Sequence, residues 1–129
     1  MCNDFSAGPK GHYCHGQTTR LPLLQPYLLL LLYQEPAHGY ELVEKLLEFG
    51  FHPCLDATTV YRNLRRMEEE GLVTSQWNTQ GPGPARRLYQ LTPEGEDVLH
   101  SWASTIRRRK ETLEKFLDRY NRYFPPERR

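Results

Sequence analysis

Thiol and imidazole side chains gather near the start of this 129-residue chain, at Cys2, His12, Cys14 and His15, with Cys54 farther on. Thiolates and imidazoles bind zinc, copper(I) and iron cofactors, and exposed thiols can act as redox switches. The chain has no C-x-x-C pair, and three of these residues lie too close together to bind one tetrahedral ion comfortably. A metal, haem or iron–sulfur site, a redox switch and incidental residues all remain open.

A second set of side chains suits nucleic acid. After Asp56, apolar residues at Val60, Leu64 and Met67 predict one buried helix face, which leaves polar residues on the other faces. Arginine can pair with guanine and asparagine with adenine, while hydroxyl groups hold phosphates. The alternative is a solvated face whose arginines pair with nearby glutamates. The candidate DNA-binding residues are Thr58, Thr59, Arg62, Asn63 and Arg66, followed later by Arg86 and Arg87.

The elements that must position these residues begin with three short helices. Dense leucines predict a first helix over about 25–34, and helical spacing of apolar residues predicts a second over about 39–49. Asp56 is a candidate N-cap for the third helix, which Gly71 ends. Residues 1–20 are rich in glycine and polar residues without a regular period, which predicts an N-terminal arm.

Two strands follow the third helix. Residues 72–77 and 87–91 can pair across a turn at Gly81-Pro82-Gly83-Pro84. Three helices and a hairpin, in this order, form a winged helix-turn-helix, whose third helix enters the major groove of DNA. The predicted fold is therefore mainly α with a small β-hairpin wing, and residues 21–92 form a winged helix-turn-helix DNA-binding domain.

A long helix follows from Thr92 and Pro93 to about Tyr123. Its apolar residues form two interleaved rows spaced by seven, which predicts a coiled-coil seam interrupted at Arg109. The seam could pack on the chain's own core, but the helix is longer than that core requires. Residues 93–129 are therefore predicted to be a C-terminal dimerisation helix and tail. The predicted dimerisation residues are Leu99, Trp102, Ile106, Leu113, Phe116 and Tyr120.

The overall composition excludes several classes of protein. The 17 Lys and Arg residues nearly balance 16 Asp and Glu, so a nucleic-acid role depends on where the charges lie. The longest apolar run is interrupted by prolines, and the N-terminus lacks the features of a secretory signal, which predicts a cytoplasmic protein without membrane contact. No common nucleophile, phosphate-loop or metalloprotease motif is present, so the chain is not expected to be an enzyme.

Three segments in order carry a resemblance to a known family: PAHGYEL at 36–42, TVYRNLRRMEEEGLV at 59–73 and RLYQLTPEG at 87–95. With them the chain resembles the PadR family of transcriptional regulators over about residues 21–121. The resemblance implies a homodimeric repressor in the cytoplasm of a bacterium or archaeon, whose third helices and wings bind an inverted-repeat operator. It adds Tyr61 to the candidate DNA-binding residues, because Tyr40, Tyr61 and Tyr89 match positions that pack or contact phosphate.

The resemblance also implies release of DNA by an effector. Effectors of the family are often small aromatic or planar molecules, and aromatic side chains could line a cavity for one. The alternative is that these rings are ordinary packing residues. A different class of function is an adaptor that uses the winged fold to bind proteins. The predicted effector-site residues are Trp77, Trp102, Phe116 and Tyr120.

Overall fold

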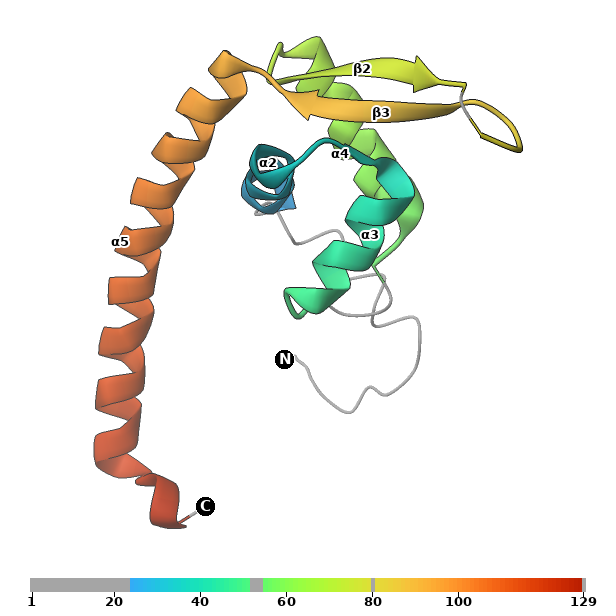
Figure 1. Cartoon of the computed structure of the whole chain (residues 1–129). Helices are drawn as coiled ribbons and strands as arrows, with labels where there is room; N and C mark the ends of the chain where they lie inside the picture. Colours follow the sequence, from blue (N-terminus) through green and yellow to red (C-terminus); the bar gives the residue numbers. More distant parts are fainter. Residues whose placement is uncertain (1–23, 52–54, 80, 129) are drawn as a thin grey trace.

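The computed structural model of the chain describes residues 24–51, 55–79 and 81–128. Helix α2 is the innermost element of a small domain, and α5 leaves one side of this domain and extends well beyond it (Figure 1). In chain order the elements are α2 (Leu24–Gln34), β1 (Ala37–His38), α3 (Gly39–Glu48), α4 (Ala57–Glu69), β2 (Val73–Asn78), β3 (Arg86–Leu91), α5 (Pro93–Tyr123) and a 3-10 turn (Pro126–Arg128).

Helix α4 forms as its sequence predicts. The carboxylate of Asp56 accepts a hydrogen bond of 2.8 Å from the backbone N–H of Thr58, which caps the first turn. Val60, Leu64 and Met67 are fully buried on one face. The helix ends before Gly71, whose φ of +81° favours glycine. The polar faces of α4 are therefore left for other contacts.

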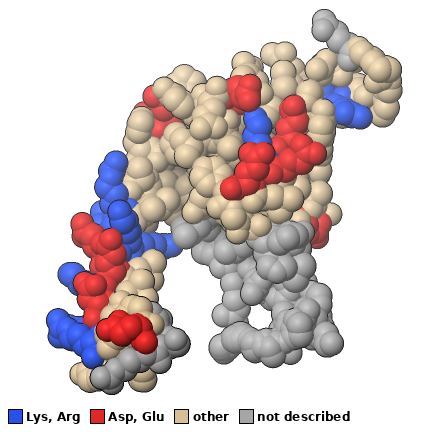
Figure 2. Space-filling model, turned by 60° about the horizontal axis from the view of Figure 1, so that its bottom comes forward, with Lys and Arg blue, Asp and Glu red and all other residues tan. Residues whose placement is uncertain are grey.

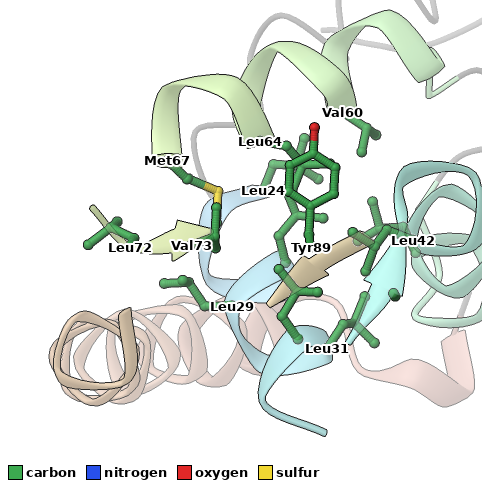
Figure 3. Packing of buried hydrophobic residues seen from close by; sticks show 14 of the residues in the cluster. Leu24, Leu29, Leu31, Leu42, Val60, Leu64, Met67, Leu72, Val73 and Tyr89 are labelled. Atoms are coloured by element: carbon green, nitrogen blue, oxygen red, sulfur yellow. The ribbon is translucent and has the colours of Figure 1, made fainter. Parts of the chain in front are cut away.

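One apolar core joins the helices to the sheet. The leucines of α2 lie at its centre, between α4, α3 and β3 (Figure 3). Tyr89 projects from β3 toward α4, and burial raises the pKa of its hydroxyl above the usual value (Figure 3). The core thus fixes the wing strand β3 against α4.

The sheet has one strand more than predicted. Its order is β1-β3-β2, and both pairings are antiparallel, with Ala37 opposite Tyr89 and Val73 opposite Leu91. The expected two-stranded hairpin is correct for β2 and β3, but β1 adds two residues at the other edge of β3. A strand of two residues shows no alternation, so its sequence gives no periodic signal.

Thr92 connects three elements at the start of α5. Its hydroxyl donates a 2.7 Å hydrogen bond to the carbonyl oxygen of Gly71 and accepts one of 3.0 Å from the N–H of Gly95. Its own N–H donates to the carbonyl oxygen of Leu72 at 3.1 Å. The end of α4, the start of β2 and the first turn of α5 are therefore held together at one residue.

Candidate nucleic-acid interface

The part of α4 from Ala57 to Arg66 presents a polar, cationic surface on its exposed face. Thr58, Arg62 and Arg66 are exposed, and their spacing of four places them on neighbouring positions of one face. No Asp or Glu occurs between Ala57 and Met67, whereas three glutamates follow at the C-terminal end. This part of the helix can therefore approach an anionic partner.

Two other predicted residues of α4 are partly engaged within the helix. Thr59 and Asn63 are half-buried, and the side-chain amide of Asn63 donates to the backbone carbonyl oxygen of Thr59 at 2.9 Å. One amide donor of Asn63 is thus already used. Tyr61 lies on a different face, exposed and directed toward the start of α3.

The two arginines of the wing have different environments. The guanidinium of Arg87 donates to the hydroxyl of Ser75 at 2.7 Å and lies 3.6 Å from Oε1 of Glu68. The Ser75 hydroxyl in turn donates to Oε2 of Glu68 at 2.8 Å. The guanidinium also lies over the ring of Trp77, 4.9 Å from the ring centre. Arg87, predicted to bind DNA, is therefore already held by α4 and β2.

Arg86, next to Arg87 on β3, lies over an aromatic ring of α3. Its guanidinium is 4.9 Å from the centre of the Tyr40 ring, and the same ring stacks on His38. The N–H of His38 donates to Glu41 at 2.7 Å, and this bond lowers the pKa of the Glu41 carboxyl. The start of α3 is thus fixed and carries Tyr40 beneath Arg86.

A hollow of about 860 Å³ lies between α4, the start of α3 and the wing. Gly39 lets the ring of Tyr61 pack closely against the start of α3 in the lining of the hollow. A Cβ atom at this position would overlap that ring. Glu68 and Glu69 contribute negative charge to the lining. The exposed rings and cations around the hollow are Tyr40, Tyr61, Arg65, Trp77, Arg86 and Arg87.

The predicted dimerisation residues divide into two groups along α5. Leu99 and Trp102 pack against the domain's own core, and Ile106 lines a hollow of about 550 Å³ between α5 and α2. Leu113 and Phe116 are exposed, and the half-buried Tyr120 stacks on Phe116. The heptad rows do not include Leu117 and Phe124, which are also exposed and extend the same face.

The basic run of α5 is not an isolated positive patch. Blue and red side chains are intermingled along the outer half of this helix in Figure 2. Arg107–Lys110 is followed within about one turn by Glu111 and Glu114, so negative charges lie close to the positive ones. This distribution is typical of a solvated helix face.

The predicted effector-site residues are not all brought together. Trp102 donates from its indole N–H to the side-chain oxygen of Gln25 at 2.8 Å and lines the hollow against α2. Phe116 and Tyr120 lie farther along the same face of α5. Trp77 lies on β2 and lines the hollow beside α4 instead. The grouping of Trp77 with the other three is not what the structure shows.

The predicted metal or redox residues Cys2, His12, Cys14, His15 and Cys54 lie outside the described residues. Among residues 24–51, 55–79 and 81–128, no group of three or more His, Cys, Asp or Glu is placed to hold a metal ion. None of the helices in these ranges is both long and apolar enough to cross a membrane.

Comparisons with known proteins identify the family. The model of the transcriptional regulator PadR-like family matches residues 28–101, more than half of the chain. The negative transcriptional regulator PadR of Bacillus subtilis is 27% identical over 81 residues, which make up 62% of this chain and 44% of that protein. The chain thus matches less than half the length of that relative.

Solved structures agree with this match. A PadR family transcription regulator from Clostridium difficile is 31% identical, with a TM-score of 0.63, over 72% of this chain and 96% of that one. Bacillus subtilis PadR, solved in complex with operator DNA, is 27% identical, with a TM-score of 0.57, over 63% of this chain and 46% of that one.

The predicted fold class is therefore confirmed, as is the expectation that the chain is not an enzyme, since the family consists of transcriptional regulators. The chain belongs to the PadR-like family of transcriptional regulators.

Proposed function

We propose that the protein is a homodimeric repressor that binds an inverted-repeat operator through α4 and the wing and is released by a small aromatic effector. The observation that carries the proposal is the exposed face of Thr58, Arg62 and Arg66 beside an arginine-bearing wing, in a chain of this family. Similarity to Bacillus subtilis PadR, a negative regulator solved with operator DNA, supports both operator binding and repression.

The direct test is enrichment of bound sequences from a random duplex library, using the full-length protein. The expected consensus is an inverted repeat whose half-site centres lie about 34 Å apart, one turn of DNA, because two α4 helices enter successive major grooves on one side of the duplex. A consensus without dyad symmetry would contradict the dimer, and failure to enrich any sequence would contradict DNA binding.

Dimerisation is proposed to use the outer half of α5. Leu113, Phe116 and Leu117 are each more than half exposed, and together with Tyr120 and Phe124 they continue the face that packs on α2. An apolar face of this length on a helix outside its own core is typical of a helix that pairs with a second copy.

Leu113→Glu is expected to convert the dimer into a monomer at micromolar concentration, because pairing would bury an unpartnered carboxylate. Sedimentation velocity measures the change. Ser104→Glu introduces the same charge on the exposed opposite side of the helix, about 180° from Leu113, and is the matched control, expected to remain dimeric. A dimeric Leu113→Glu variant would show that this face is not the interface.

The effector is proposed to bind along α5, where Trp102 and Ile106 face Tyr27, Leu30 and Tyr33 of α2 across the 550 Å³ hollow. Planar aromatic compounds added to the protein–operator complex are expected to release the DNA. Release that persists unchanged in a Trp102→Leu variant would place the effector elsewhere.

A further inference from the structure

We infer that Trp77 packs on a deoxyribose of the operator strand that passes between α4 and the wing, and that Arg87 holds the indole ring in place for this contact. The inference rests on the proposed function. Where α4 occupies the major groove and the wing lies over the neighbouring backbone, the strand that separates the two must pass between them. The hollow of about 860 Å³ lies at this place, bounded by Tyr61 and Arg65 of α4 and by Trp77 of β2.

The exposure of Trp77 points to a partner. Its side chain is 61% exposed, although an indole ring is among the largest apolar surfaces a protein can bury. Tyr40 and Tyr61 are exposed on the other walls of the same hollow. Three exposed rings around one hollow, with cations between them, suit a strand of alternating apolar sugars and anionic phosphates.

The charges of the hollow also favour a phosphate strand. Glu68 is hydrogen-bonded by Ser75 and ion-paired with Arg87, so its negative charge is compensated within the protein. Among the other charged residues of the lining, Arg65 and Arg86 are positive and Glu69 is negative. The hollow therefore carries a net positive charge. Arg86 is held over Tyr40 rather than over a carboxylate, so its charge faces the hollow without a paired anion at that contact.

Arg87 acts in this arrangement as a positioning residue. It is held by Glu68 and Ser75, and its guanidinium covers one face of the Trp77 indole. A ring fixed on one face by a cation loses less conformational freedom when its other face meets a partner. Arg87 therefore presents Trp77 to the strand instead of binding a phosphate itself.

The test measures operator affinity against salt concentration, with the full-length protein and the enriched duplex. Trp77→Ala is expected to weaken binding about tenfold without changing the slope of log K against log salt, because an indole releases no counterions. Trp77→Phe is expected to restore most of the affinity. Arg86→Gln, the comparison variant, is expected to reduce the slope by about 1 for each phosphate that the protein no longer neutralises.

Three outcomes separate the inference from the proposed function. Wild-type affinity in Trp77→Ala, with binding still weakened in Arg62→Ala, overturns the inference and leaves operator binding intact. A reduced slope in Trp77→Ala, like that of Arg86→Gln, also overturns it, because Trp77 would then act by placing a charge. A wild-type protein that binds no duplex overturns the proposed function itself. Equal thermal midpoints of the variants exclude unfolding as the cause.

Discussion

Arg62→Ala is expected to lower affinity for the operator by about 30-fold or more. Arg62 is exposed on the part of α4 that has no carboxylates, one turn from Thr58 and Arg66. A bidentate arginine–guanine pair is worth about 1–3 kcal/mol, and a dimer would be deprived of two of them, or about 2–6 kcal/mol. Binding to a fluorescently labelled operator, titrated at fixed salt, gives the affinity.

The loss should depend on sequence. Substituting the recognised base pair in the operator should weaken binding by the wild-type protein and have little further effect on Arg62→Ala, because that variant has no guanidinium to pair with it. Arg108→Ala removes the same charge from the exposed surface of α5 and is expected to bind nearly as well as the wild type. Equal reductions in affinity for the two variants would mean that Arg62 contributes only general charge.

Gly95→Ala is expected to destabilise the domain by about 1–3 kcal/mol and to lower its thermal midpoint by roughly 5–10 °C. A Cβ atom at Gly95 would overlap the backbone carbonyl oxygen of Leu72 and crowd the side chain of Leu91. Leu72 is a difficult residue to displace, because the same carbonyl accepts the hydrogen bond from the N–H of Thr92.

The expected loss of stability is opposite in direction to the usual effect of this substitution, which makes the prediction specific. Replacing glycine by alanine inside a helix ordinarily stabilises it by up to about 1 kcal/mol. Ser101→Ala, at an exposed site of the same helix, is the control and should change stability by less than about 0.5 kcal/mol. Thermal and urea unfolding followed by circular dichroism measure both variants. A more stable Gly95→Ala protein would show that the first turn of α5 is not packed against Leu72 in this way.

The helices were predictable because their boundaries are local. Asp56 and Thr92 cap the helices that follow them, as their positions before apolar or proline-led segments indicate. Strand β1 was not predictable, since Ala37 and His38 become a strand only by pairing with Tyr89 and Leu88. Such a short strand depends on tertiary contact instead of sequence periodicity.

The sequence predicts which residue types form the candidate site, but not which side chains each of them contacts within the protein. The sequence identifies Arg62 and Arg66 as exposed, because the buried face of α4 is clear. It gives no sign that Arg87 is held by Glu68 and Ser75, which lie 19 and 12 residues earlier in the chain. Residue type alone groups Trp77 with Trp102, because both are aromatic, although the two side chains line different hollows.

Because α5 is long and is anchored at Thr92, a small rotation there would displace its far end by a large distance. Together with the packing of Leu99 and Trp102 on the core, the hydrogen bonds of Thr92 fix the direction in which the helix leaves the sheet, close to the end of α4. The helix has 31 residues. At 1.5 Å per residue it is about 46 Å long, so a swing of roughly 10° at Thr92 would move its far end by about 8 Å. In a dimer joined along α5, the same small rotation would change the separation of the two α4 helices, so the anchoring of α5 at Thr92 and on α2 sets the span over which two grooves can be reached together.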